Sequence, residues 1–149
     1  MTLDQFVTKY QGRYLEYNND IYKNQCTDLF WQYLKEVLGI NPRPYQGWGS
    51  AKNIYNNAYR ITDFNKNFVK IPNGPNNIPK KGDIIFWGTY PGVTGWAGHV
   101  AIYLKGDLYI VYSFDQNYPT RSRCAIVKHG YNKLFHGYRG VMGWFSPKK

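Results

Sequence analysis

The sequence predicts an α+β domain in which N-terminal helices pack on an antiparallel sheet of about five to six strands. Two observations lead to this fold class. Apolar residues recur at helical spacing in the first third of the chain, and runs rich in β-branched and aromatic residues, separated by turn residues, follow from about residue 68. Helices followed by a meander of strands indicate an antiparallel sheet rather than alternating βαβ units.

The first helix is expected over residues 3–10. Thr2 is a good N-cap, and Gln5 follows it at the capping-box spacing. Apolar residues on one helical face then occur at Leu3, Phe6, Val7 and Tyr10.

The second helix begins at Cys26 and ends near Gly39, which is placed as a C-cap and is followed by Pro42 and Pro44. Its apolar stripe comprises Cys26, Leu29, Phe30, Tyr33, Leu34 and Val37. A third helix is predicted over residues 51–59, with Ser50 as its N-cap.

Six strands are predicted in the rest of the chain. Lys105, Gly106 and Asp107 form the predicted hairpin turn between the third and the fourth of them. The predicted strands cover residues 68–71, 83–87, 99–104, 108–114, 124–128 and 138–145.

Composition excludes several classes of protein. At 149 residues the chain suffices for one domain with a full core, and 43% hydrophobic and 19% aromatic residues argue against intrinsic disorder. No apolar run approaches the roughly 20 residues of a membrane span, so no membrane insertion is expected. The net charge of +10 favours a polyanionic partner. Two cysteines are too few for a disulfide framework.

Cys26 is the first candidate catalytic residue, because it lies at the start of the second predicted helix. Unpaired backbone N–H groups there favour negative charge, and a thiolate is the form of cysteine that attacks carbonyl carbons. The alternative is that Cys26 is a small buried hydrophobe. His99, which begins a predicted strand after a Gly-rich loop, is the candidate base.

A third polar group is needed to orient the imidazole of His99, and Asp115 ends the strand that pairs with the His99 strand. A two-residue turn at Gly106 and Asp107 would put Asp115 on the opposite face of the sheet from His99. A three-residue loop or a β-bulge would set the two residues opposite each other. Catalysis by this pair therefore predicts one of these two irregularities.

Five segments, in this order, resemble the blocks of CHAP domains, the cysteine, histidine-dependent amidohydrolases/peptidases of phage endolysins and bacterial wall hydrolases. They are Gln25-Cys26-Thr27-Asp28-Leu29, Trp48-Gly49-Ser50-Ala51-Lys52, Pro79-Lys80-Lys81-Gly82-Asp83, Gly98-His99-Val100-Ala101-Ile102 and Asp115-Gln116-Asn117. The resemblance implies a papain-like fold and hydrolysis of an amide bond in peptidoglycan.

The resemblance also assigns roles to matching positions. Cys26 is similar to the nucleophile, His99 to the general base, and Gln25 to the side chain that helps the Cys26 N–H form an oxyanion hole. Asp115 stands where many members have Glu, and Asn117 lies at a second polar position of the site. Either of these two is a candidate to orient the imidazole.

Some family members bind calcium near the nucleophile through several carboxylates. Here only Asp20 and Asp28 are available and Lys23 adds positive charge, so we expect neither a tight calcium site nor any required cofactor. Cys124 has no histidine at a suggestive position and is expected to be structural.

The remaining histidines, His129 and His136, lack metal-ligand spacing with either cysteine, so no zinc site is expected. Trp96, in the Gly-rich loop of residues 88–98, is the best candidate for contact with substrate.

Three functions compete at this stage. The first is a monomeric hydrolase, amidase or endopeptidase, of the Gram-positive cell wall, whose anionic polymers would attract the positive charge. The second is a catalytically silent wall-binding module of the same fold. The third, a nucleic-acid binder, is disfavoured because the basic residues are scattered and no nucleic-acid motif is present.

The sequence also suggests where the domain ends and where it acts. Residues 1–146 are expected to form the catalytic domain, and residues 147–149 the start of a linker to a further C-terminal domain. No signal peptide is visible, so synthesis in the host cytoplasm and action at the cell wall are expected.

Overall fold

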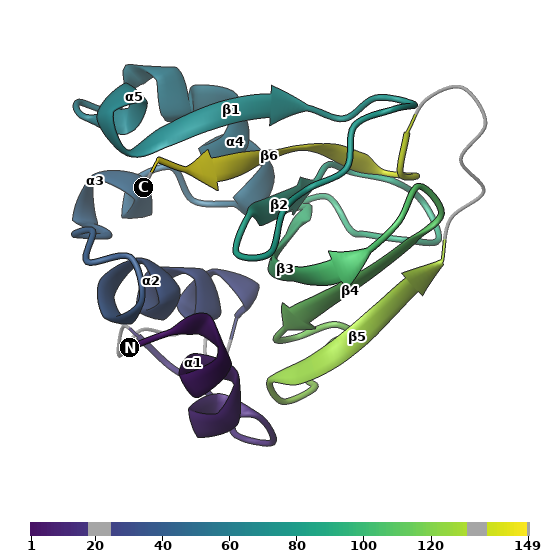
Figure 1. The fold of residues 1–149 in the computed structure, drawn as a ribbon, viewed down its shortest axis with the longest axis horizontal. Coiled ribbons are helices and arrows are strands. Elements are labelled where there is room, and N and C mark those ends of the chain that lie inside the picture. The colour runs from purple at the N-terminus through teal and green to yellow at the C-terminus, as the bar shows by residue number, and fades with distance from the viewer. Residues whose placement is uncertain (18–24, 131–136, 149) are drawn as a thin grey trace.

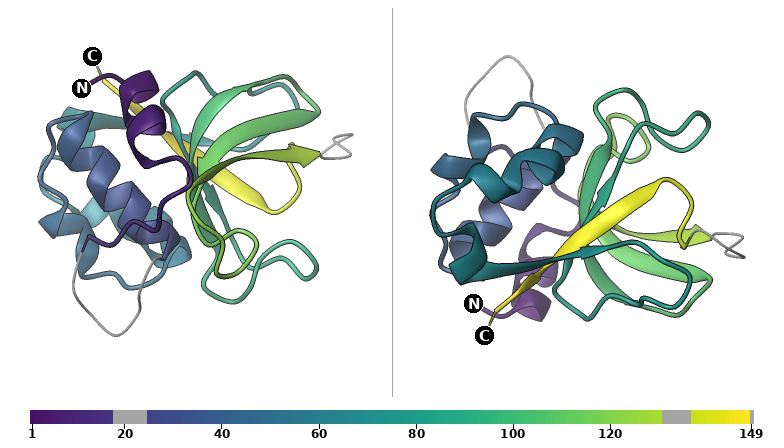
Figure 2. Two further views of the ribbon diagram at one scale, coloured as in Figure 1. Left: turned by 90° about the horizontal axis from the view of Figure 1, so that it is seen from below. Right: turned by 90° about the horizontal axis from the view of Figure 1, so that it is seen from above.

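The computed structural model describes residues 1–17, 25–130 and 137–148, and these residues form a two-layer α+β domain. The helices lie on one side of a twisted and curved sheet, as Figures 1 and 2 show. The predicted fold class is therefore confirmed. Among the described residues, no helix is long and apolar enough to cross a membrane.

The two predicted N-terminal helices are present. Helix α1 (Leu3–Tyr10) begins with a complete capping box, in which Thr2 and Gln5 exchange hydrogen bonds. Helix α2 (Cys26–Glu36) buries most of its apolar stripe, and Gly39 follows it with a φ of +66°, the left-handed conformation expected of a glycine at a helix end.

The third predicted helix is shorter than expected. Helix α4 (Ala51–Asn57) has the predicted N-cap Ser50, but its last turn tightens into the 3₁₀ helix η1 (Ala58–Arg60). Two four-residue helices, α3 (Arg43–Gln46) and α5 (Phe64–Asn67), were not predicted. Proline tolerates the first turn of a helix, so the proline-rich segment ends α2 and still forms a turn of helix itself.

Within the described residues the sheet has six strands, in agreement with the predicted number, and every pairing in it is antiparallel. The spatial order is β1-β6-β2-β3-β4-β5. The strands are β1 (Phe68–Pro72), β2 (Ile84–Trp87), β3 (His99–Gly106), β4 (Ile110–Asp115), β5 (Ala125–Gly130) and β6 (Val141–Pro147). The last strand ends at Pro147, which pairs with Phe68.

Both faces of the sheet carry buried apolar residues. Alternate residues of the central strands enter two separate apolar clusters, so that Ile84 and Phe86 pack toward the helices while Ile85 and Trp87 pack on the opposite face. The helix-side cluster is the larger and includes Leu29, Phe30 and Leu34 of α2.

The hairpin of β3 and β4 contains the irregularity on which the site depends. Its turn lies at residues 108–109, two positions later than predicted, because the Asp107 N–H donates to the Ile110 carbonyl. The register then shifts by one residue, since Tyr103 pairs with Ser113 whereas Lys105 pairs with Tyr112. The bulge at Leu104 was one of the two irregularities required by the sequence argument, and the predicted turn position was wrong.

Candidate active site

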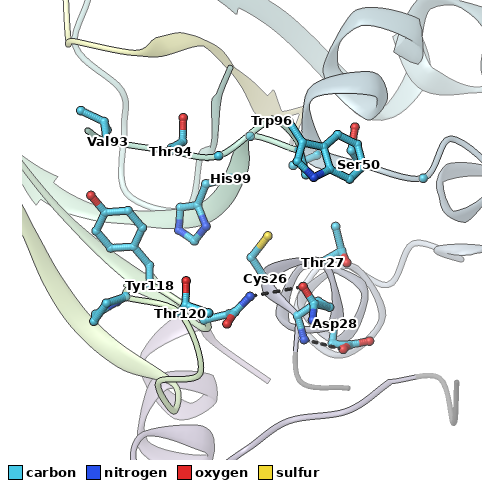
Figure 3. A pocket seen from close by; sticks show the side chains of 18 of the residues that line it. Cys26, Thr27, Asp28, Ser50, Val93, Thr94, Trp96, His99, Tyr118 and Thr120 are labelled. Atoms are coloured by element: carbon cyan, nitrogen blue, oxygen red, sulfur yellow. Dashed lines mark hydrogen bonds between the residues drawn. The ribbon is translucent and has the colours of Figure 1, made fainter. Parts of the chain in front are cut away.

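A pocket of about 780 Å³ opens where the N-terminus of α2 faces the start of β3 (Figure 3). Its lining includes Cys26 and His99 together with the segments 93–98 and 117–120. Five of the six predicted site residues, all but Asp115, line it directly, and Asp115 is buried behind His99.

Cys26 is the first residue of α2, as the sequence predicts. Asp28 closes the helix start by accepting the Gln25 N–H at 2.8 Å, and its second oxygen accepts the Tyr17 N–H at 3.4 Å. The Cys26 side chain is half-buried, and Figure 3 shows it beside the imidazole of His99 in the pocket. The helix N-terminus therefore presents the thiol to the pocket at the end where the helix dipole favours negative charge.

The backbone before Cys26 is held by a residue to which the sequence argument gave no role. The Gln116 side chain is fully buried and donates through Nε2 to the Leu15 and Gln25 carbonyls, both at 2.8 Å. Its Oε1 accepts the Leu15 N–H at 2.7 Å. Gln116 thus connects the end of β4 to the segment that carries the nucleophile.

His99 faces Cys26 from the sheet, and Asp115 holds its other ring nitrogen. The His99 Nε2 lies 2.7 Å from the Asp115 Oδ2, which leaves Nδ1 for Cys26. Burial disfavours the imidazolium, but hydrogen bonds with Asp115 and Cys26 outweigh burial and raise the pKa of His99 to about 10.

The bulge explains how Asp115 reaches the imidazole, although the two residues are not directly opposite as expected. Ile102 pairs with Phe114, so by the same register Ala101 is level with Asp115. His99 is two residues further along and therefore on the same face, in a diagonal position. Without the extra residue at Leu104, Asp115 would point to the helix side of the sheet.

Asn117, the other candidate to orient the imidazole, contacts Gln25 instead. Its Nδ2 donates to the Gln25 Oε1 at 3.2 Å, and its Oδ1 accepts the Arg121 N–H at 2.6 Å. Asn117 has a φ of +63°, a conformation that asparagine tolerates better than most residues. In this geometry Asp115 is the residue that contacts His99, and Asn117 orients the Gln25 amide.

A second histidine, His129 of β5, also reaches Asp115. Its Nε2 lies 3.2 Å from the Asp115 Oδ2, and the Ser113 Oγ donates to the other carboxylate oxygen at 2.5 Å. The sequence pattern indicated no role for His129, since its spacing does not suit a metal site. No local pattern marks it, because only the strand register brings β5 beside the site; His136 lies outside the described residues.

Trp96 lies on the rim of the pocket with 77% of its surface exposed, in a position to meet a ligand. The loop before His99 is anchored by the Lys52 N–H, which donates to the Ala97 carbonyl at 3.1 Å. Gly98 has a φ of +73°, and a Cβ there would lie 2.2 Å from the Trp87 carbonyl oxygen. This position therefore requires glycine.

Cys124 and Asp28, the one described residue among the possible calcium ligands, make structural hydrogen bonds. Cys124 is buried, its Sγ lies 3.4 Å from the Gln116 Oε1, and burial raises its pKa to about 12. Asp28 already caps α2, and Asp20 lies outside the described residues. The described residues contain no group of three His, Cys, Asp or Glu side chains suited to a metal ion, and independence of calcium stays a prediction.

Solved structures of endolysin-like proteins share this fold. A wild type endolysin, LysIME-EF1, superposes with a TM-score of 0.70 and 21% sequence identity over 99% of this chain and 64% of its own. Ly7917 superposes with a TM-score of 0.62 and 18% identity over 95% of this chain and 60% of its own. The chain therefore spans less than two thirds of either protein, and at these identities the likeness concerns the fold.

Sequence comparison gives the family. No curated protein sequence matches the chain significantly. The family model of the CHAP domain, however, matches residues 16–117, which include Cys26, His99, Asp115 and Asn117. Because this match covers more than half of the chain and includes the residues that meet in the pocket, the chain belongs to the CHAP domain family.

Proposed function

We propose that the chain is the catalytic domain of a peptidoglycan hydrolase that cleaves an amide bond with Cys26 as its nucleophile. The observation that carries this proposal is that Cys26 and His99 lie together in one pocket, with Asp115 hydrogen-bonded to His99 from behind, in a member of the CHAP family. The bond is that of an N-acetylmuramoyl-L-alanine amidase or of a peptide endopeptidase, since both reactions use the same groups.

The first chemical step is formation of the thiolate. The Cys26 proton passes to the Nδ1 of His99 while the Nε2–H of His99 donates to Asp115, whose negative charge stabilises the imidazolium. Burial alone would raise the pKa of Asp115, but hydrogen bonds from His129 and His99 hold it below its ordinary value. The carboxylate is therefore ionised when the imidazolium forms.

The thiolate then attacks the amide carbon, and the imidazolium protonates the leaving amine. Water, deprotonated by His99, hydrolyses the resulting thioester and regenerates the thiol. The negative oxygen of each tetrahedral intermediate is stabilised by the Cys26 N–H and by the Gln25 amide. Because Asn117 donates to the Gln25 Oε1, it orients the Gln25 Nε2 as the group available to donate. One such donor contributes about 3 kcal/mol to lowering the barrier.

The substrate reaches this site from the rim that carries Trp96, whose exposed indole would stack on a sugar or peptide of the wall. The net charge of +10 supports attraction to the anionic polymers of a Gram-positive wall. Action at the wall as a monomer, without a metal, without nucleic acid and without membrane insertion, completes the proposal.

The test is the loss of turbidity of purified Gram-positive cell walls. The intact chain should clear them, Cys26→Ala should not, and Cys124→Ala is the matched control because that buried thiol lies outside the chemistry. Clearing in the presence of a chelator is expected, and mass spectrometry of the released fragments identifies the bond. If the intact chain and Cys26→Ala both sediment with walls and neither clears them, the chain is a wall-binding module and the proposal is wrong.

A further inference from the structure

The Asp115 carboxylate receives a hydrogen bond from each of two imidazoles. The His99 Nε2 at 2.7 Å and the His129 Nε2 at 3.2 Å both approach the same oxygen, Oδ2, while the Ser113 Oγ donates to Oδ1. His99 comes from β3 and His129 from β5, so the two rings approach the carboxylate from the two strands that flank β4.

This cluster is enclosed by two aromatic rings. The Trp87 ring lies 5.2 Å from the ring of His99 and 4.9 Å from that of His129, measured between ring centroids. The Tyr118 ring lies 5.0 Å and 4.9 Å from the same two imidazoles. Asp115 is fully buried, and the side chain of His129 is 2% exposed. Protein groups must therefore supply the donors that water would otherwise provide.

We propose that His129 is a positioning residue for the reaction, because its Nε2–H holds the Asp115 carboxylate in the orientation that receives His99. This inference rests on the proposed function. Asp115 is one methylene shorter than the Glu that the family often carries here, and a carboxylate at the end of a strand can rotate. Donors on both of its oxygens stop that rotation and keep Oδ2 in line with the His99 Nε2.

A positioning role for His129 requires one particular tautomer of its imidazole. Asp115 is an acceptor when ionised, so His129 must carry its proton on Nε2. The titratable neighbours of His129 include Asp115 and Tyr118, with His99 adjacent across the carboxylate.

The experiment measures the reactivity of Cys26 without any cell-wall substrate. The rate of alkylation by iodoacetamide is followed from pH 5 to 10 for the intact chain, His129→Gln and His129→Leu, with peptide mapping to separate Cys26 from Cys124. Glutamine carries an amide nitrogen close to the position of the imidazole Nε2, whereas leucine carries no donor. We expect alkylation near neutral pH to slow about tenfold in His129→Leu and to stay within about threefold of the intact rate in His129→Gln.

Wall hydrolysis by the same proteins should show a lower kcat with unchanged KM in His129→Leu. Tyr138→Phe is the matched control, because it removes a buried hydroxyl that donates to the Asp107 carbonyl from the same apolar cluster without touching Asp115. It should leave the alkylation profile unchanged even if its melting temperature falls. A chain that clears no walls but still shows the His129 effect on alkylation would refute the proposed substrate and support this inference.

Two results would overturn the role of His129. One is an alkylation profile of folded His129→Leu that coincides with that of the intact chain, and the other is an equal loss in His129→Leu and His129→Gln. If His129→Leu does not fold, the ¹H–¹⁵N spectrum of the imidazoles in the intact chain decides. A protonated Nε2 on His129 supports the inference, and a His129 protonated on Nδ1 alone overturns it.

Discussion

The two walls of the pocket are built in different ways. The helical wall consists of Gln25, Cys26 and Asp28, which are neighbours in the sequence and are arranged by one helix start. The sheet wall consists of His99, which lines the pocket, and of Asp115 and His129 behind it; the three residues come from three strands and meet only through strand register. The capping residues of one helix are enough to position the nucleophile. The positions of the base and its partners depend instead on the register of three strands, which an insertion or deletion between them would change.

The most severe way to break the sheet wall is to delete Leu104. Removal of the bulge restores an uninterrupted register and turns either His99 or Asp115 to the other face. We expect wall hydrolysis to fall by about 10⁴-fold, because a catalytic histidine without its carboxylate loses both its orientation and the charge that stabilises the imidazolium, and we expect marked destabilisation as well. Activity and thermal melting are measured side by side. Leu104→Ala, which keeps the extra residue, is the control and should retain most of the activity.

Asp115→Asn tests the same wall without moving the backbone. The amide carries no charge to stabilise the imidazolium, so kcat should fall about 10²- to 10⁴-fold with the fold preserved. Steady-state hydrolysis and far-UV circular dichroism check this expectation. Asn117→Ala, which acts on the helical wall through Gln25, should cost less, and a larger loss there would assign the orienting role to Asn117.

Gln116→Leu breaks the link between the two walls. It leaves the Leu15 amide and the Leu15 and Gln25 carbonyls without their buried partner, at a cost of about 1–3 kcal/mol for each such group. Denaturant unfolding should show a loss of roughly 3 kcal/mol or more. Gln116→Glu keeps an oxygen that accepts the Leu15 N–H but cannot donate to the Leu15 and Gln25 carbonyls. If Gln116→Glu and Gln116→Leu lose the same free energy of unfolding, the loss comes from the missing donors.

The pH dependence of the free energy of unfolding tests the raised pKa of His99 in the sheet wall. The folded-state pKa of about 10 lies above the unfolded value of about 6.5. The stabilisation from protonated His99 is therefore complete below about pH 6.5 and is lost as the pH rises toward 10. The free energy of unfolding should fall over this interval in the intact chain and less steeply in His99→Gln. Parallel curves would contradict the raised pKa.

The smallest effect is expected at the rim, where Trp96 belongs to neither wall. Trp96→Ala should raise KM for wall substrate several-fold and change the free energy of unfolding by less than about 0.5 kcal/mol, because the indole is exposed. An unchanged KM would remove Trp96 from the substrate path.

The sequence by itself determined the fold class, the position of Cys26 at a helix start, and the segments that carry His99, Asp115 and Asn117. Capping residues, helical spacing and short motifs predict these features, and each of them involves only residues that are close along the chain. For the same reason the first helix and the number of strands were predicted correctly.

Only the tertiary structure decided which of Asp115 and Asn117 contacts His99, and only it placed Gln116 and His129 at the site. The contact of His99 with Asp115 depends on a strand register that a single extra residue, Leu104, reverses from one face to the other, and the contact of His129 with Asp115 depends on the register of β4 with β5. Nothing local in the sequence distinguishes a bulge there from a regular strand, because the energy that selects the bulge comes from burying both faces of the sheet.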